Sequence, residues 1–284
     1  MTGGAALPSI IISIVVPYYN ANSCLKRLFV SLQDYALRDD IEIIIVNDGS
    51  EKAHTEALDE HVEQTQWPRL RVLHLAENGG AAKARKAGIQ AAKGEFIAFL
   101  DSDDAWASNK LDWQLAAMRK CDAVISGSVC KQIEESQLEH FRAEPLHQYQ
   151  VTRYLPLKAL FYNAYSTPSV MLKRSVALQN PFNEHVRYSE DVDCWRRILL
   201  QHKGIIINGP NAYMFKHAFL SDQGSLSSYT IKMSAAQLAS LGRLLKNASI
   251  SPKFKVLIPF AMVWAALKAV RREVIVWRHR RGTR

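Results

Sequence analysis

The sequence predicts an α/β protein with a mostly parallel sheet covered by helices on both faces. In the first 127 residues, short β-branched runs alternate with segments whose apolar residues recur at helical spacing. The apolar runs are continuous, as in strands that are buried on both faces. Alternation of strands and helices is typical of βαβ units, in which each helix connects two parallel strands.

The individual elements follow from the same two patterns. A β-branched run ended by Pro17 gives the first strand, and Leu25, Leu28, Phe29 and Leu32 give the first helix its apolar face. Strands are expected at residues 10–16, 41–46, 70–75, 96–100 and from 123, and helices at 21–35, 53–64, 81–92 and 110–120. Further along, we expect a strand at 166–173, a helix at 189–202, one or two short strands in 204–215, a loop at 220–229 and a helical remainder.

Polar residues gather where the predicted strands end. They occur at residues 19–20, 48–49, 77–80 and 101–104. In open α/β sheets, ligands bind beyond the carboxyl ends of the strands. This edge of the sheet is therefore the expected site.

Three aspartates in four residues, at positions 101, 103 and 104, follow the strand at 96–100. In an extended chain, Asp101 and Asp103 lie on the same side. Carboxylates this close repel one another unless a cation or solvent compensates them. Mg²⁺ and Mn²⁺ prefer oxygen ligands and often share them with phosphates. The local sequence equally permits a solvated turn in which Asp104 caps the next helix.

Asp48 lies at the same edge, within the turn sequence Asn-Asp-Gly-Ser. Its carboxylate is suited to accept hydrogen bonds from a ribose or a base, and equally to stabilise the turn itself. Farther on, Asn78-Gly79-Gly80 opens a helix that carries Lys83, Arg85 and Lys86. These cations oppose the helix dipole, so they indicate either a bound anion or a solvated basic face.

Ser189-Glu190-Asp191 is the third acidic site. It reads either as an ordinary helix start or as a general base that deprotonates a hydroxyl nucleophile. His217 precedes a polar loop that contains Ser225 and is suited to close over a ligand.

Taken together, the order of these motifs resembles the family 2 glycosyltransferases of the GT-A fold, of the type that builds bacterial cell-surface polysaccharides. The motifs are strand–Pro-Tyr-Tyr-Asn, strand–Asn-Asp-Gly-Ser, Asn-Gly-Gly with a basic helix, strand–Asp-Ser-Asp-Asp and, about 90 residues later, Ser-Glu-Asp. The resemblance covers about residues 9–227. It implies a Rossmann-like GT-A sheet, followed here by a basic helical extension.

The resemblance assigns roles by position. Pro17 and Tyr19 would line the nucleotide pocket, Asp48 would bind the base or ribose, and Arg85 would lie near the donor. Asp101 and Asp103 would hold Mn²⁺ or Mg²⁺ on the donor diphosphate, with Asp103 favoured as the metal ligand, and Asp191 would be the base with Glu190 beside it. His217 and Ser225 would belong to a lid or contact the diphosphate. The chain departs from the family at Asn47, where Asp is more common, and at Lys86, where Asn is common, so the exact donor contacts stay open.

The activity implied is metal-dependent, inverting transfer of a sugar from a nucleotide sugar, a UDP-sugar above all, to a hydroxyl of a glycan or lipid-linked glycan. The expected catalytic domain spans residues 1–219, with a nucleotide-sugar half at about 1–127 and an acceptor half at about 128–219. Residues 220–284 would form a mobile loop and an amphipathic, basic helical tail.

The tail suggests a membrane partner. Residues 268–284 hold seven basic residues and one glutamate, so six of the nine net positive charges lie there. An apolar segment at 256–267 precedes them, and Trp277 lies among them. This composition is typical of an interfacial helix on an anionic leaflet, although a helix packed on the protein also fits. Pro259 interrupts the apolar run, which is too short to span a bilayer.

Other function classes are less consistent with the sequence. The basic residues lack the interleaved aromatics of a single-strand nucleic-acid platform, so we expect no nucleic-acid partner. The four cysteines are far apart, which favours reduced thiols in a cytoplasmic protein. Together with the basic tail, this gives the expected location, the inner face of the cell membrane. A non-catalytic sugar-nucleotide or membrane-binding module on the same fold stays open. A two-carboxylate glycoside hydrolase is disfavoured by the nucleotide-type sheet edge.

Overall fold

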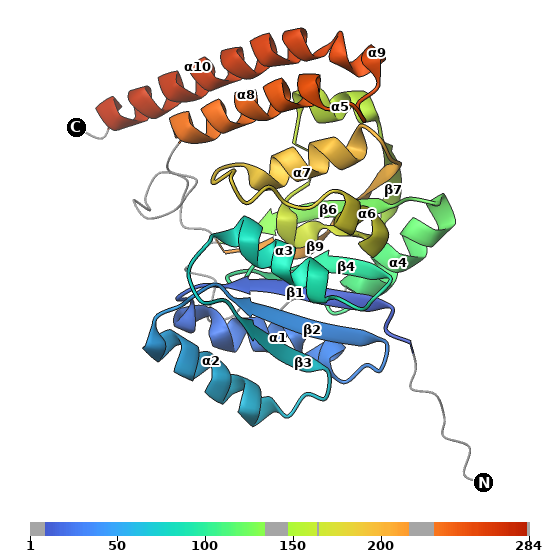
Figure 1. Ribbon diagram of the computed structural model, residues 1–284, viewed down its shortest axis with the longest axis vertical. Coiled ribbons are helices and arrows are strands. Elements are labelled where there is room, and N and C mark those ends of the chain that lie inside the picture. The colour runs from blue at the N-terminus through green and yellow to red at the C-terminus, as the bar shows by residue number, and fades with distance from the viewer. Residues whose placement is uncertain (1–8, 134–146, 164, 216–229, 283–284) are drawn as a thin grey trace.

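The structure, a computed structural model, describes residues 9–133, 147–163, 165–215 and 230–282. Within these ranges, nine strands form one mixed sheet with helices on both faces (Figure 1). The strands are β1 (Ile12–Tyr18), β2 (Ile41–Asn47), β3 (Leu70–His74), β4 (Phe96–Phe99), β5 (Ala105–Trp106), β6 (Ile125–Gln132), β7 (Gln150–Tyr154), β8 (Met171–Lys173) and β9 (Gly204–Met214).

The helices fall mostly where the periodicity predicted them. The α-helices are α1 (Leu25–Ala36), α2 (Lys52–Thr65), α3 (Ala81–Ala91), α4 (Lys110–Cys121), α5 (Pro156–Phe161), α6 (Arg174–Gln179), α7 (Glu190–Leu199), α8 (Thr230–Lys246), α9 (Pro252–Lys255) and α10 (Ile258–Gly282). Two short 3₁₀ turns are η1 (Asn22–Cys24) and η3 (Thr167–Ser169).

The strand order is β3-β2-β1-β4-β8-β6-β9-β5, with β7 also paired to β9. Strands β1 to β4 pair in parallel with one another in the order β3-β2-β1-β4, and β6 pairs in parallel with β9. β8 is antiparallel to both β4 and β6, so it joins two sets of strands that run in the same direction. The prediction of a mostly parallel sheet is confirmed.

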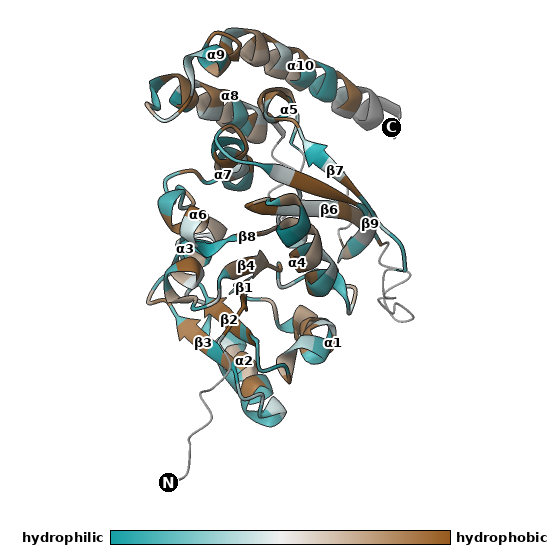
Figure 2. Ribbon diagram, turned by 90° about the vertical axis from the view of Figure 1, so that its right-hand side faces the viewer, coloured by the Kyte–Doolittle hydropathy of each residue, from teal (hydrophilic) through white to brown (hydrophobic). Residues whose placement is uncertain are grey.

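The continuous apolar runs are explained by the two cores of the sheet. In β1, Ile14 and Val16 belong to the core beneath α1, α2 and α4, whereas Val15 belongs to the core beneath α3, α6 and α7. Alternate residues of β2 divide in the same way. Because both faces are covered, neither face of these strands is polar, and Figure 2 shows the strands as largely hydrophobic segments between helices.

Several elements differ from the sequence predictions. β1 continues through Pro17 to Tyr18. Val15 and Pro17 direct their backbone groups toward β4, and β4 ends at Phe99, so the missing N–H of Pro17 costs no ladder hydrogen bond. The strand predicted at 166–173 is only β8, preceded by η3, because Pro168 begins a 3₁₀ turn. The segment 204–215 forms one long strand, and β5, β7, α5 and α6 were not predicted.

The C-terminal helices form a layer of their own. α8 and α10 lie side by side, and α10 also contacts α5 (Figures 1 and 2). A third core beneath them is made of Leu160, Leu200, Leu241, Leu244, Ile250, Ile258 and Ala261. Although α10 has 25 residues, no helix in the described ranges is long and apolar enough to cross a bilayer. The predicted C-terminal helical extension is present.

Candidate active site

The carboxylate of Asp48 accepts hydrogen bonds from the residues just before the N-terminus of α3. Its Oδ1 accepts a hydrogen bond from the Gly79 N–H (3.0 Å), and its Oδ2 accepts from the Gly80 N–H (2.7 Å) and from Asn78 Nδ2 (3.1 Å). Burial raises the pKa of this carboxyl, and the two backbone N–H groups oppose the rise. The carboxylate of Asp48 therefore binds the neighbouring loop, and the turn that contains it is stabilised by Asn47, whose Oδ1 accepts a hydrogen bond from the Ser50 N–H at 3.1 Å. The contact of Asp48 with a nucleotide stays a prediction.

Two glycines allow the loop after β2 and the loop after β3 to approach each other in this way. Gly49 has a φ of +66°, and a Cβ on it would lie 2.5 Å from the Asn78 backbone nitrogen. Gly80, the residue before α3, has a φ of +84°. Residues that carry a side chain rarely adopt these backbone conformations, so glycine at both positions allows the two loops to meet here.

Arg85 is the centre of the site. It is buried, its Nη2 donates to Asp101 Oδ1 at 2.6 Å, and its Nη1 donates to Glu190 Oε1 at 3.0 Å. One guanidinium therefore connects the loop after β4 with the start of α7. The sequence placed Arg85 near the donor. The structure places it between the two acidic motifs.

Glu190 and Asp191 open α7 from a strained position. Ser189 has a left-handed φ of +54° and makes no capping hydrogen bond with its side chain, unlike an ordinary serine helix start. Burial raises the pKa of Glu190, the Arg85 charge lowers it and the Asp191 charge raises it, with a net upward direction. Asp191 Oδ2 accepts a hydrogen bond from Thr167 Oγ1 at 3.1 Å.

The other two aspartates of the acidic motif have different surroundings. Asp103 is half-buried, and its backbone oxygen accepts a hydrogen bond from Arg27 Nη2 at 2.8 Å. Asp104 is buried, and its Oδ1 accepts from the Phe215 N–H at 3.4 Å, so this side chain faces β9 and does not cap α4, which follows Asn109. Asp101 and Asp103 remain the candidate cation ligands.

The first motif presents one tyrosine to solvent and buries the other. Tyr18 is buried and its hydroxyl donates to Asn22 Oδ1 at 2.6 Å, whereas Tyr19 is 50% exposed at the end of β1. Asn20 then adopts a left-handed φ of +48°. Tyr19 and the half-buried Pro17 lie at the same sheet edge as Asp48, as the sequence predicted.

Residues 13–177, more than half of the chain, match the sequence model of the family described as "Glycosyl transferase family 2". The chain belongs to glycosyltransferase family 2. This confirms the family that the order of motifs indicated.

Curated relatives of this family member come from several bacteria. It is 29% identical over 216 residues to the putative teichuronic acid biosynthesis glycosyltransferase TuaG of Bacillus subtilis. This alignment covers 75% of this chain and 80% of TuaG. It is 28% identical over 225 residues to an uncharacterized glycosyltransferase of Rickettsia felis, covering 76% of this chain. The chain spans 35% of the length of that Rickettsia protein and 26% of the putative glycosyltransferase EpsH of B. subtilis.

Solved structures share the fold at lower identity. Residues 1–349 of TarS from S. aureus, in complex with UDP-GlcNAc, align with a TM-score of 0.64 and 19% identity, covering 88% of this chain and 70% of TarS 1–349. The mannosyltransferase PcManGT from Pyrobaculum calidifontis, in complex with GDP-Man and Mn²⁺, aligns with a TM-score of 0.64 and 15% identity, covering 96% and 79%. These alignments confirm the GT-A fold of the glycosyltransferase.

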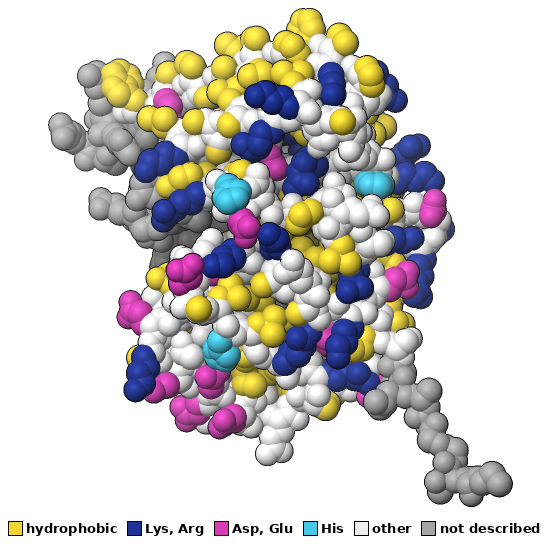
Figure 3. Space-filling view, viewed as in Figure 1, with side chains coloured by type: hydrophobic (Ala, Val, Ile, Leu, Met, Phe, Trp, Pro, Cys, Tyr) yellow, Lys and Arg dark blue, Asp and Glu magenta, His cyan; other side chains and the backbone are white. Residues whose placement is uncertain are grey.

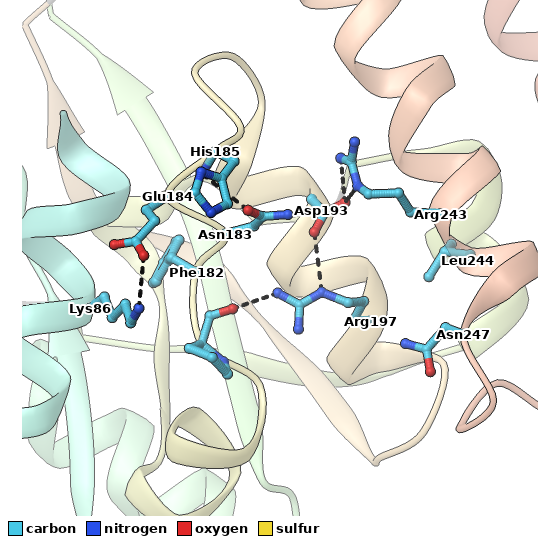
Figure 4. Close-up of a pocket in the computed structure, with 11 residues that line it drawn as sticks. Lys86, Phe182, Asn183, Glu184, His185, Asp193, Arg197, Arg243, Leu244 and Asn247 are labelled. Carbon is cyan, nitrogen blue, oxygen red and sulfur yellow. Dashed lines mark hydrogen bonds and ion pairs between the residues drawn. The ribbon is translucent and has the colours of Figure 1, made fainter. Parts of the chain in front are cut away.

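The basic residues of α3 pair with carboxylates of the protein. Lys83 Nζ lies 3.5 Å from Glu77, and Lys86 Nζ lies 3.1 Å from Glu184. Together with the bridge of Arg85, these pairs show that all three cations have acidic partners within the chain. Figure 4 shows the Lys86 pair at one side of a cavity of about 440 Å³.

On the opposite side of that cavity, Asp193 accepts hydrogen bonds from Arg197 Nε (3.2 Å) and Arg243 Nη2 (2.8 Å), which ties α7 to α8 (Figure 4). Sequence reasoning missed both Asp193 and Thr167. A third acid at position 193 was the available signal for the first, whereas nothing in the sequence marks Thr167.

Two predicted residues are not placed. His217 and Ser225, the candidates for a lid or diphosphate contact, lie outside the described residues. Within the described ranges, no group of three or more His, Cys, Asp or Glu side chains converges as a ready metal site. The four cysteines are free thiols.

Proposed function

We propose that this chain is a metal-dependent, inverting glycosyltransferase that moves a sugar from a UDP-sugar to a hydroxyl of a glycan or lipid-linked glycan in bacterial polysaccharide synthesis. The observation that carries the proposal is the buried Arg85, which joins Asp101 of the donor-side motif to Glu190 beside the candidate base. A non-catalytic binding module has no need to connect these two motifs. Relatives named as glycosyltransferases, TuaG among them, support the same class.

In the proposed reaction, Asp191 takes the proton of the acceptor hydroxyl as its oxygen attacks the anomeric carbon. The new oxygen–carbon bond forms while the bond from that carbon to the diphosphate oxygen breaks, and the nucleoside diphosphate leaves. One in-line displacement inverts the configuration. Thr167 holds one oxygen of the base in place, and the Glu190–Arg85 pair fixes the start of its helix.

The donor set fits a divalent cation that shares its coordination with phosphate. Asp101 and Asp103 supply hard oxygen ligands, and because two carboxylates do not complete an octahedral shell, diphosphate oxygens and water would supply the rest. When bound, the cation would stabilise the negative charge of the leaving diphosphate. Two structural neighbours in complex with Mn²⁺ support this proposal.

The proposed donor contacts are Pro17, Tyr19, Asp48, Arg85, Asp101 and Asp103. Tyr19, exposed at the end of β1, supports a stacking or edge contact with the nucleotide base. For Arg85, burial between two carboxylates supports an indirect role, in which it sets the position of Asp101 against the diphosphate.

We also propose that the protein binds the inner face of the cell membrane through α10. Large apolar side chains remain exposed on the outer side of this helix, and Figure 3 shows hydrophobic side chains gathered over α9 and α10. Basic residues follow them in the sequence. Apolar burial and attraction to anionic lipids together give a stable peripheral anchor.

Calorimetric binding of UDP, GDP and dTDP, each with and without Mn²⁺, tests the donor site. We expect UDP to bind in a Mn²⁺-dependent way and Asp103→Ala to abolish that dependence. Asp112→Ala, which removes an exposed aspartate of α4, is the matched control and should bind like wild type. Failure of all three nucleotides to bind would overturn the donor assignment.

Transfer itself is tested with Asp191→Asn. The variant should bind UDP normally and lose sugar transfer from UDP-GlcNAc by about 10³-fold or more, because an amide in place of the Asp191 carboxylate cannot take the proton. Near-normal transfer by this variant would contradict the assignment of Asp191 as the base.

A further inference from the structure

A second cavity lies directly beside the candidate base. It has a volume of about 480 Å³, within the range of small-molecule sites, and Asp191 is part of its wall. The remaining wall comes from β6, from β9 and from the segment before η3. This places the cavity on the acceptor half of the sheet, on a different side of α7 from the cavity of Figure 4, whose wall contains Asp193.

The floor of the cavity is rigid. The buried Tyr165 donates its hydroxyl to the Ile205 backbone oxygen at 2.9 Å, and its ring lies against Gly127 of β6. A Cβ at Gly127 would lie 2.1 Å from the ring, so glycine is needed for the tyrosine to lie flat against the strand. Two residues farther along, Thr167 holds Asp191, and the same segment therefore shapes the cavity and orients the base.

The wall of the cavity is polar but almost uncharged. Asn163, Asn208 and Ser166 offer amide and hydroxyl groups, and Val129 and Ile206 add apolar surface. Among the described residues that form the wall, Asp191 is the only charged one, and none is lysine or arginine. A carboxylate or phosphate in this cavity would face the Asp191 charge, and none of the described wall residues is a cation that could pair with it.

These groups match the chemistry of a neutral sugar ring. Hydroxyl groups of a pyranose donate to and accept from amides, and its C–H faces pack on aliphatic side chains. Asn208 Nδ2 donates to Thr152 Oγ1 at 2.7 Å, which holds the amide plane in place. Ser166 directs its hydroxyl to Met214 Sδ, a weak acceptor, so this hydroxyl can turn to a sugar at little cost.

We infer that this cavity is the acceptor subsite and that it takes an uncharged sugar residue, such as a hexose or N-acetylhexosamine, in preference to a uronic acid or a sugar phosphate. The inference rests on the proposed function, because it takes Asp191 as the base. It goes further by naming the charge class of the residue that receives the new sugar.

A pair of acceptors that differ in one group tests the inference. 4-Nitrophenyl β-D-glucoside and 4-nitrophenyl β-D-glucuronide share the ring and the aglycone, and only the second carries a carboxylate. Their binding to the full chain with UDP and Mn²⁺ present can be compared by saturation-transfer NMR, which needs no turnover. We expect the glucoside to bind at least about tenfold more tightly, since one uncompensated like-charge contact is worth a factor of this size.

Val129→Lys then adds a positive charge that offsets the Asp191 charge in the described wall. Val129 is 46% exposed on β6, so a lysine there extends into the cavity without disturbing the core. We expect this variant to reduce the preference for the glucoside at least several-fold. Val151→Lys is the matched control, because Val151 is also exposed, lies on β7, which pairs with β9, and is not part of the cavity wall; it should leave the preference unchanged.

Three outcomes would overturn the inference: equal or tighter binding of the glucuronide, binding of neither glycoside, or an unchanged preference in Val129→Lys. Calorimetry of UDP on the same samples separates this failure from that of the proposed function. If UDP binds in a Mn²⁺-dependent way while the glycosides fail, the donor site stands and the acceptor class is wrong. If UDP also fails to bind, the proposed function is wrong.

Discussion

Arg85 has an unusual combination of burial and charge. Its side chain is 6% exposed, and two carboxylates from distant parts of the chain share its guanidinium. Burying one charge against two partly buried ones is costly, and the arrangement is stable only while each has its partner. Arginine suits this place better than lysine, because its planar fork donates in two directions at once.

Removal of Arg85 should therefore destabilise the protein strongly. We expect Arg85→Gln to lower the free energy of unfolding by about 3 kcal/mol, because it leaves the partly buried Asp101 and Glu190 without this counter-charge. Glu190→Gln in the same chain should recover part of this loss. Lys86→Gln is the control, since the neighbouring lysine forms an exposed pair worth less than about 1 kcal/mol. Urea denaturation of the four proteins checks this, and equal losses in Arg85→Gln and Lys86→Gln would contradict it.

The residue contacts also show where sequence reasoning ends. The acidic motifs, Asp48 and Arg85 were found because they follow strand ends or lie at a helix start, and these are local patterns. The hydrogen bond between Arg85 and Glu190 joins residues 105 positions apart, and that of Thr167 with Asp191 joins residues 24 apart. Such pairings depend on how the helices pack on the sheet, which no local pattern encodes.

At the scale of elements, α7 contributes side chains to two different cavities. Asp191 and Asp193 are two positions apart and so face different sides of the helix. Asp191 contributes to the acceptor cavity, and Asp193 is held by Arg197 of its own helix and Arg243 of α8. The C-terminal helices are thereby fixed to the helix that carries the candidate base.

This connection predicts a dependence of stability on pH. Burial alone would raise the pKa of Asp193, but the hydrogen bonds and charges of Arg243 and Arg197 outweigh it and hold the pKa below its ordinary 3.8. The folded state therefore favours the ionised form, and the resulting stability is present above about pH 4 and is lost as the pH falls through the lowered pKa.

Asp193→Asn removes that contribution. We expect the variant to be less stable than wild type by about 1–3 kcal/mol at pH 7, and the difference to shrink below pH 4. Asp112→Asn, whose carboxylate is half exposed, should show a much smaller difference at pH 7. Urea denaturation between pH 3 and pH 7 provides the comparison. A difference that grows toward low pH would show the wrong sign and contradict the assignment.

The elements that the sequence missed share a physical cause. β5 has two residues, and its only partner is β9, more than 100 positions away. The exposed residues of β7 give it no apolar alternation that a core would require. By contrast, the other strands and the α-helices of residues 10–121 were predicted within a few residues, because two cores impose strong periodicity on them.

At the scale of the whole molecule, the described surface is apolar on one side and leads into a basic C-terminus. Phe260, Val263, Leu267, Val270, Val274 and Trp277 of α10 are 43–65% exposed and recur at intervals of three and four, so they lie along one outer face. Contiguous exposed patches of this kind mark an interaction surface. Six net positive charges in residues 268–284 favour an anionic lipid surface as the partner.

Vesicle co-sedimentation measures this interaction. We expect the full chain to bind vesicles that contain phosphatidylglycerol, to bind neutral phosphatidylcholine vesicles less, and to lose affinity at high salt, because the Debye length shortens. Leu267→Glu should weaken binding by about tenfold or more. It replaces a leucine whose burial in the lipid would be worth about 2 kcal/mol with a charged side chain.

The matched control is Leu37→Glu, because Leu37 is 75% exposed at the end of α1, away from the C-terminal helices, and should have no effect. Light scattering of the same proteins without lipid shows whether a second copy covers the face instead. A dimer that Leu267→Glu dissociates, together with wild-type vesicle binding that is equal for neutral and anionic lipids, would assign α10 to self-association and overturn the membrane proposal. Monomers that bind only anionic vesicles would assign the apolar face of α10 to an anionic lipid surface.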